Sequence, residues 1–498
     1  MDFPIFHLDL LGNRALIAMI AVLHVLINHG LAVGMMPLIA AMEWWGHKKK
    51  DPRWDNLAYK ILFVCFIITT TVGALTGVGI WFSASLINPY SIGSLIRVFF
   101  WGWFIEWLVF ITEVCLILAY TLTWKKWTAE GKKKQHIWLG FALGFFSWIT
   151  MAIIVSILGF MMDPGNWLTH HSLWNGFTNP IYLPQLGFRT PLALAKAGII
   201  AMFLCLLFVK RGDIFRQEAL RGLGLWTLCA APFVLLGGYW YYSVVPASMQ
   251  ENLGVSLMTL QFTQWHDKLL HIVLGVVVTI FIVVQMAVFR PQYLRKWMLL
   301  IPLFGIIWMT GHFERVREFI RKPYIIGRYM YANGMRVEDY PLLQRDGVLA
   351  HMTYSHPLTD AEKKMSDAEI KPEGKPPLTQ EEIDQMMAKI QDGKDVFMNT
   401  CSRCHTAHGV NSITGHFTRM MGDRDWDPEV LSSYLEIMHS QPFMPPFPGN
   451  QADKDALAQY IRHLKYNETS IPGAQDSGVS VHTPKAQAPE DTNTEDKQ

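Results

Sequence analysis

The residues best suited to chemistry form the run Cys401-Ser402-Arg403-Cys404-His405 near the C-terminal end of the chain. This C-x-x-C-H spacing is typical of covalent heme attachment, because two thiols one helical turn apart can bond to the two vinyl groups of a heme. The adjacent His405 is then the expected proximal iron ligand. A zinc site or a redox-active dithiol is the alternative that two nearby cysteines leave open. We therefore predict one covalent heme c, held by Cys401, Cys404 and His405.

A second iron ligand is expected downstream of this run. Met444 is the best candidate, because the prolines that follow it, Pro445 and Pro446, favour an extended loop that could present its sulfur. Three other methionines compete with it: Met420, Met421 and Met438. The segment 390–465, which ends in an amphipathic helix over 453–464, resembles class I cytochromes c. Ligation by histidine and methionine raises the reduction potential of a heme, which suits an electron carrier.

The composition indicates an integral membrane protein. Of 498 residues, 51% are hydrophobic and only 17% are charged, whereas soluble chains carry about 25% charged residues. A membrane-spanning helix needs about 20 apolar residues. Eight runs are candidates: 13–42, 57–82, 95–124, 136–162, 190–210, 222–245, 266–290 and 297–312. We predict an all-α fold, in which a polytopic transmembrane helix bundle of about eight spans is followed by a small helical cytochrome c domain.

The basic residues of the loops predict the orientation of these spans. Lysine and arginine are frequent in the loops after spans one, three, five and seven, whereas the alternate loops 83–94, 163–189 and 246–265 contain a single basic residue, Arg189. Positively charged loops face the cytoplasm. We expect both termini and the cytochrome c domain on the periplasmic side of a bacterial cytoplasmic membrane. Because the charges are spread along the chain and form no single basic patch, no nucleic-acid partner is expected.

Composition also divides the chain into four parts. We assign 1–339 to the transmembrane bundle and 379–466 to the cytochrome c domain. The segment 340–378 is rich in proline and charged residues and is predicted to be a linker with little regular structure. The polar segment 467–498 is predicted to be a disordered tail.

Two acidic residues inside the third span are candidates for proton transfer. Glu106 and Glu113 are seven residues apart, so they share one face of a helix at a separation of about 10 Å. Either carboxyl alone could be an interhelical hydrogen bonder, but charged groups inside spans are costly and usually functional. As a pair they favour a proton route.

Several histidines in the spans are candidate iron ligands. His24 and His29 are five residues apart in the first span, so they point about 140° apart and cannot face one site. The spacing alone leaves the choice between them open. Further candidates lie at the ends of the last two spans: His266, His271, His312 and the nearby Glu314. Four cations at the expected outer ends of spans could pair with heme propionates or with lipid headgroups: Arg14, Arg97, Arg189 and Lys196.

Residues 10–330 resemble subunit I of cytochrome bd-type quinol oxidases. The resemblance is carried by Arg14 ten residues before His24, Met42-Glu43, Gly73-Ala74-Leu75-Thr76-Gly77, Glu106 with Glu113, Phe160-Met161-Met162-Asp163-Pro164, and Arg317-Glu318-Phe319-Ile320-Arg321-Lys322-Pro323-Tyr324. It implies b- or d-type hemes in the bundle, with His24 as an axial ligand and Arg14 and Arg321 beside the cofactor. It also implies a second membrane subunit.

The chain departs from that family in four places. No histidine lies in 185–200, the loop 246–265 is short, the ninth span is absent, and Gly311 stands near the position of a ligating glutamate, which His312 or Glu314 would replace. These departures suggest that electrons enter through the fused heme c rather than at the usual quinol site. The electron donor is expected to be a cytochrome c or a quinol.

Three functions are compatible with these features. The first is a bd-like terminal oxidase subunit that passes electrons from heme c to buried hemes for oxygen reduction. The second is an electron relay between membrane quinol and extracytoplasmic cytochromes or a partner oxidoreductase, in which His266 or His271 would ligate a repurposed heme. The third is a plain membrane anchor for the cytochrome c domain. The acceptor, the donor and the type and number of buried hemes stay open at this point.

Overall fold

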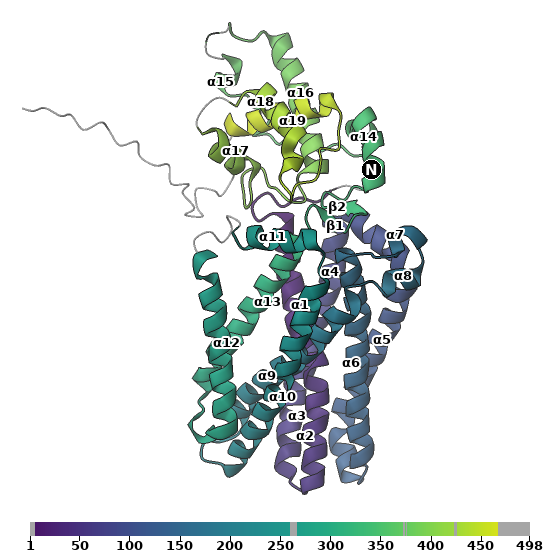
Figure 1. The fold of residues 1–498 in the computed structure, drawn as a ribbon, viewed down its shortest axis with the longest axis vertical. Helices are drawn as coiled ribbons and strands as arrows, with labels where there is room; N and C mark the ends of the chain where they lie inside the picture. The colour runs from purple at the N-terminus through teal and green to yellow at the C-terminus, as the bar shows by residue number, and fades with distance from the viewer. Residues whose placement is uncertain (1–4, 259–265, 372–373, 375, 423–425, 467–498) are drawn as a thin grey trace, which may run out of the picture.

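The computed structural model describes residues 5–258, 266–371, 374, 376–422 and 426–466. A long helical bundle carries a smaller helical domain on one end (Figure 1). We call this end of the bundle the cytochrome end. The predicted tail 467–498 lies outside the described residues.

Eight segments of the described chain are long and apolar enough to cross a membrane, as predicted. Their helices are α1 (Asn13–Ile27) with α2 (Met35–Lys49), α3 (Pro52–Ile68) with α4 (Ala74–Ile87), α5 (Pro89–Ala129), α6 (Lys133–Met162), α9 (Tyr182–Phe208), α10 (Ile214–Val244), α12 (His266–Phe289) and α13 (Leu300–Ile320). Short helices in the connections are α7 (Trp167–His170), α8 (Leu173–Phe177) and α11 (Ala247–Met258). The predicted end of the eighth span at residue 312 is wrong. The helix continues to Ile320 because Glu314 forms ion pairs with Arg189 and Arg317.

The first two spans each contain a π-helical turn, at Asn28–Val33 and at Thr69–Gly73. The two turns contact each other. Such turns insert an extra residue into a helix and are frequent at functional sites. Both lie close to His24, the predicted iron ligand.

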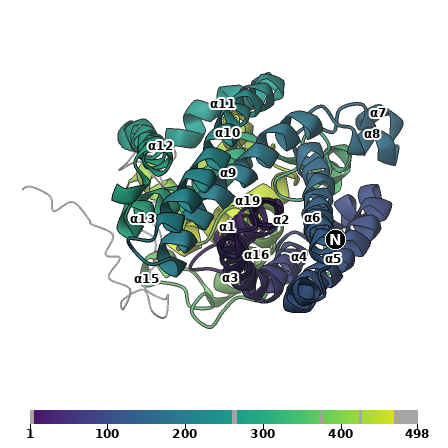
Figure 2. The ribbon, with the colours of Figure 1, turned by 90° about the horizontal axis from the view of Figure 1, so that it is seen from below.

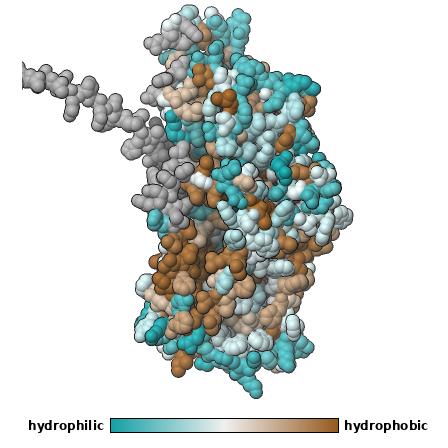
Figure 3. Space-filling model, in the orientation of Figure 1, coloured by the Kyte–Doolittle hydropathy of each residue, from teal (hydrophilic) through white to brown (hydrophobic). Residues whose placement is uncertain are grey.

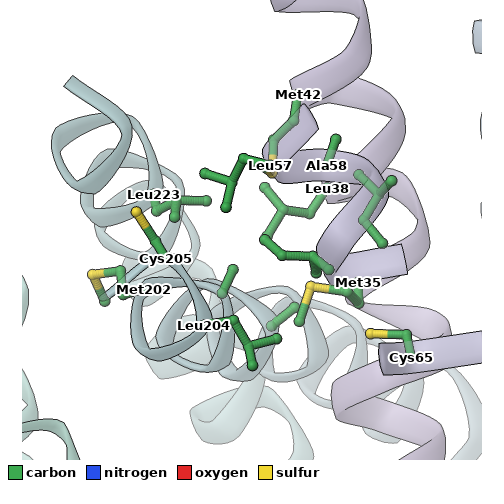
Figure 4. Packing of buried hydrophobic residues seen from close by; sticks show 14 of the residues in the cluster. Met35, Leu38, Met42, Leu57, Ala58, Cys65, Met202, Leu204, Cys205 and Leu223 are labelled. Atoms are coloured by element: carbon green, nitrogen blue, oxygen red, sulfur yellow. The ribbon is translucent and has the colours of Figure 1, made fainter. Parts of the chain in front are cut away.

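Seen along the bundle, α1 to α6 lie on one side and α9 to α13 on the other (Figure 2). The largest hydrophobic core cluster joins these halves, with side chains from α2 and α3 facing side chains from α9 and α10 (Figure 4). Hydrophobic residues also gather on the outer surface of the bundle, whereas the cytochrome end and the opposite tip are mainly hydrophilic (Figure 3). This distribution fits a bundle that crosses a membrane.

The described part of the second domain contains four helices of nine residues or more: α16 (Gln380–Thr400), α17 (Ile413–Met421), α18 (Pro428–Ile437) and α19 (Gln451–Tyr466). α16 and α19 cross closely at Gly393, where an added Cβ would lie 2.1 Å from the carbonyl oxygen of Ala456. Phe397, Trp426 and Tyr460 fill the core beside this crossing.

The described part of the chain between the bundle and this domain contains short helices and a hairpin. A two-stranded antiparallel hairpin of β1 (Tyr324–Ile326) and β2 (Met330–Tyr331) follows α13, and apart from this hairpin and isolated bridges the regular structure of the described residues is helical. The predicted linker 340–378 contains α14 (Tyr340–Asp346) and α15 (Asp367–Ile370). It is held to the second domain by a hydrogen bond of 2.8 Å between the buried side chains of His463 and Glu369.

Candidate heme sites

The C-x-x-C-H run directly follows α16, at a turn of the backbone. The backbone N–H of Cys401 donates to Phe397, and the N–H of His405 donates to Cys401 at 2.9 Å. His405 Nδ1 donates to the carbonyl oxygen of Asn411 at 3.1 Å. This bond fixes the tautomer and leaves Nε2 free as the metal-binding nitrogen.

Burial keeps the imidazole of this run neutral and the Cys401 thiol protonated. Burial, together with the neighbouring His416, lowers the pKa of His405 to about 3, so the imidazole is neutral, the form that binds iron. Burial raises the pKa of the Cys401 thiol to about 11. Among the described residues, no group of three or more His, Cys, Asp or Glu side chains is placed to hold a metal ion. The residues present therefore fit a covalent heme.

The four candidate methionine ligands differ in exposure. Met420 exposes 54% of its surface, and Met438 is buried within the domain core. Met444 and Met421 are partly buried and pack against the same core, as Cys401 does. Burial therefore disfavours Met420, and Met444 stays the predicted second ligand.

A chain of polar contacts connects the C-x-x-C-H run to the bundle. Lys322 Nζ donates to Cys404 Sγ at 3.0 Å and lies 3.6 Å from the carboxylate of Glu318 at the end of α13. Glu318 also forms an ion pair with Arg14 at the start of α1. The heme-binding run thus lies directly over the ends of two membrane helices.

A second contact comes from the segment that precedes α1. The N–H of Val410, in the loop after His405, donates to the carbonyl oxygen of Leu10 at 3.0 Å. A Cβ added at Gly409 would lie 2.2 Å from the carbonyl oxygen of Asp9, so only glycine permits this approach. Ile5 joins the hydrophobic core of the second domain. The second domain therefore contacts the segment that leads directly into α1, the helix that carries His24.

His24 has the hydrogen bonding expected of a metal-ligating histidine. Its Nδ1 lies 3.2 Å from the carbonyl oxygen of Gly73 and 3.2 Å from the hydroxyl of Thr76, both in the second span. Donation from Nδ1 to Gly73 leaves Nε2 free to bind iron. The neighbouring Gly77 leaves room, because a Cβ there would lie 3.1 Å from His24 Cε1. The site therefore fits a heme ligand.

The other candidate histidines occupy different surroundings. His29 is buried in the first π-helical turn. His271 is exposed near the beginning of α12. His312 is partly buried, and its Nδ1 donates to the carbonyl oxygen of Trp308 at 3.1 Å. The side chain of His266 lies outside the described residues. Iron ligation by His271 or His312 stays a prediction.

The two acidic residues of α5 lie on one uninterrupted stretch of that helix. Glu113 accepts hydrogen bonds from Ser147 at 2.5 Å and from Thr150 at 3.2 Å, both on α6. Glu106 is partly buried, two turns nearer the cytochrome end. The sequence did not reveal Ser147 and Thr150, because hydroxyl residues are common in spans and carry no signal of their own.

A buried polar cluster at the end of the bundle opposite the cytochrome end was also not predicted from the sequence. The carboxylate of Glu43, which is fully buried, accepts hydrogen bonds from Tyr120 at 2.7 Å and from His136 at 2.6 Å. Lys133 lies 2.6 Å from the same carboxylate. Glu43 could have indicated this cluster, because it belongs to the Met42-Glu43 pair on which the family resemblance partly rests.

The predicted propionate partners divide into two groups. Arg97 is exposed, which favours headgroup contact. Arg14 is paired with Glu318, and Arg189 and Lys196 are buried inside the bundle. Arg321 is 6% exposed, its NH1 donates to the carbonyl oxygen of Ile325 at 3.0 Å, and burial lowers its pKa to about 10. A buried guanidinium of this kind fits an anionic partner.

Comparison with known proteins identifies both parts of the chain. Residues 13–249 match the family of cytochrome bd terminal oxidase subunit I, and residues 388–461 match the family of cytochrome c oxidase, cbb3-type, subunit III. The chain therefore combines a bd oxidase subunit I domain with a C-terminal cytochrome c domain, and the predicted resemblance is confirmed. No curated protein matches the chain. The solved structure of the bd oxidase from Geobacillus thermodenitrificans is 16% identical, covers 64% of this chain and 88% of its own, and gives a TM-score of 0.48.

Proposed function

We propose that this chain is the large subunit of a bd-like terminal oxidase in which electrons enter at heme c and serve oxygen reduction within the bundle. Four electrons and four protons then convert one oxygen molecule to two waters. The observation that carries the proposal is the position of the C-x-x-C-H run over the ends of α1 and α13, with Lys322 3.0 Å from Cys404. When bound, heme c and the hemes of the bundle would each supply reversible one-electron transfer.

The residues of the chain have separate roles in this proposal. Cys401, Cys404, His405 and Met444 hold heme c, and His24 holds a b- or d-type heme. Lys322, which lies beside Glu318 at the end of α13, bonds to Cys404 and so fixes the second domain on the bundle, and the donor and acceptor sites keep one relative position. That position favours transfer within the chain over transfer between diffusing partners.

Protons are proposed to reach the site along α5. The hydroxyls of Ser147 and Thr150 orient the carboxyl of Glu113. Glu113 would hold a proton on a carboxyl oxygen and pass it toward Glu106. Buried acids within spans are typical of such routes.

The assembly follows from the same proposal. The protein lies in a bacterial cytoplasmic membrane with both termini and the cytochrome c domain on the periplasmic side. A second membrane subunit covers part of the bundle, and a soluble cytochrome c or a quinol donates electrons.

The test is oxygen uptake by the purified complex, with ascorbate and a redox mediator as reductant. We expect uptake that carbon monoxide or cyanide inhibits, together with a carbon monoxide difference spectrum. Reduced hemes that consume no oxygen and do not bind carbon monoxide would contradict the proposal and favour the electron relay. A complex with heme c alone would leave only the membrane anchor.

A further inference from the structure

His29 is a buried histidine with an unused ring nitrogen. It exposes 4% of its surface, and its Nδ1 has no hydrogen-bond partner among the described residues. Leaving a buried polar group without a partner is unfavourable. The π-helical turn Asn28–Val33 that holds it is a local distortion of a kind often found at functional sites. Together these features indicate a ligand for the ring.

The surroundings of His29 differ from those of His24. His24 is bonded to Gly73 and Thr76 on the second span. The turn that carries His29 instead packs against α9 in the other half of the bundle, where a Cβ at Gly34 would lie 2.1 Å from the carbonyl oxygen of Ala193. The two histidines therefore serve different sites.

The helix that this turn contacts, α9, carries a buried polar stripe. Gln185, Arg189 and Lys196 lie on it and are all buried. Both amide atoms of Gln185 and the Nε of Arg189 have no partner among the described residues. A buried stripe of this composition is costly unless a polar ligand satisfies it.

The charge of this group is unbalanced. Glu314 accepts hydrogen bonds of 2.8 Å from both Arg189 and Arg317, and Lys196 donates to Thr310 at 3.0 Å. The single carboxylate of Glu314 therefore pairs with two guanidinium groups, and the ammonium of Lys196 is bonded to a neutral hydroxyl. Arg317 NH1 is also unpaired within the described part of the chain. A buried excess of positive charge requires anionic partners.

We propose that His29 ligates the iron of a further heme, distinct from the heme at His24, whose two carboxylates are held by Arg189 and Arg317. A porphyrin with two propionates is the ligand class that offers both a metal for an imidazole and two negative charges for the basic excess. The inference rests on the proposed function, because it requires hemes inside the bundle.

The test compares variants of the full chain, purified with its native partner subunits. The content of heme b and heme c is counted by pyridine hemochrome analysis, and the Soret and electron paramagnetic resonance spectra are recorded. In His29→Met, a thioether replaces the imidazole. We expect this variant to keep heme c and to show an altered spectrum for one non-covalent heme. In His29→Ala, we expect the loss of one non-covalent heme per heme c and its restoration by added imidazole.

The matched control is His136→Met. His136 is fully buried in the same bundle, but both of its ring nitrogens are already bonded, to Glu43 and to the carbonyl oxygen of Tyr120. Its substitution should leave the heme spectra unchanged.

Three results separate the alternatives. A wild-type spectrum in His29→Met, or a full set of hemes in His29→Ala, would overturn the inference alone. A loss of heme in His29→Ala that imidazole does not restore would assign His29 a packing role and would also overturn it. A wild-type complex with no heme besides heme c would refute the proposed function as well.

Discussion

The two candidate heme regions differ in how far apart their residues lie in the sequence. In the cytochrome c domain, Cys401, Cys404, His405 and the Asn411 that orients the imidazole all lie within one short segment. In the bundle, Glu113 depends on hydroxyls of the next span, and Arg189 is paired with Glu314, 125 residues away. A local site is specified by spacing, whereas a distributed site is specified by packing. Substitutions should therefore act very differently in the two regions.

The largest effect is expected from the two attachment cysteines. In Cys401→Ser with Cys404→Ser, no thiol is left to bond the vinyl groups, so covalent heme should be lost completely. Heme staining after denaturing electrophoresis measures this loss. Cys205→Ser, at a buried cysteine of the bundle core, is the control and should keep full staining. If the double variant also lost every non-covalent heme, the two regions would not be independent and the comparison would fail.

The second effect concerns the distributed region. Glu113→Gln keeps the shape of the side chain but cannot carry the proton, and loss of proton transfer at a positioned group typically costs 10²–10⁴-fold in rate. We expect oxygen uptake to fall by about 100-fold or more at unchanged heme content. Ser147→Ala removes one of the two hydroxyl contacts and should cost less. Glu130→Gln, at a residue just beyond the C-terminal end of α5, should leave oxygen uptake unchanged. A wild-type rate in Glu113→Gln would exclude this residue from the proton route.

The same contrast explains what the sequence could predict. Apolar runs of spanning length and the C-x-x-C-H spacing are local signals, and both the eight spans and the cytochrome c domain are confirmed. Glu113 could be proposed for proton transfer from the sequence, because a carboxyl inside a membrane span is unusual by itself. Its partners Ser147 and Thr150 were not, because only the packing of α5 on α6 selects them. The end of the eighth span was misplaced for a similar reason: Glu314 is neutralised by Arg189 from a distant span.

The third prediction tests whether the segment 340–378 is held in place by the cytochrome c domain. Its Glu362 accepts hydrogen bonds from Lys394 at 2.5 Å and from Tyr460 at 2.9 Å. Burial raises the pKa of this carboxyl, but the bonds from Lys394 and Thr359 outweigh burial, so the pKa lies below its usual value. A carboxyl with a lowered pKa in the folded state stabilises the fold above its unfolded pKa, and this stabilisation is lost as the pH falls through the folded pKa.

We therefore expect the backbone amides of 340–378 to lose protection against hydrogen exchange in acid. Glu362→Gln removes the charged partner of Lys394 and should weaken the segment already at neutral pH, by about 1.5–3 kcal/mol. Hydrogen–deuterium exchange with mass spectrometry at pH 7 and pH 3 measures both effects. Glu338→Gln, at a side chain that is 64% exposed, is the control. Equal protection in Glu362→Gln and wild type at neutral pH would show that this contact does not hold the segment.

The smallest effect is expected at the junction of the two regions. Lys322 is 8% exposed and lies between Cys404 Sγ at 3.0 Å and Glu318 at 3.6 Å. A cation close to a heme stabilises the reduced state, because reduction adds one negative charge. Lys322→Gln should therefore lower the midpoint potential of heme c, and Glu318→Gln should raise it. An interaction on the order of 1 kcal/mol at a partly screened site corresponds to about 40 mV for one electron.

Opposite shifts in the two variants are the decisive result, because a general loosening of the interface would move both potentials in the same direction. Spectroelectrochemical titration of the heme c α-band measures each potential. Lys363→Gln, at a lysine that is 58% exposed, should leave it unchanged. Equal potentials in Lys322→Gln, Glu318→Gln and wild type would mean that the membrane helices support the cytochrome c domain without influencing its cofactor. Opposite shifts would show that the short C-x-x-C-H run, local as it is, completes its electrostatic environment with residues of the bundle.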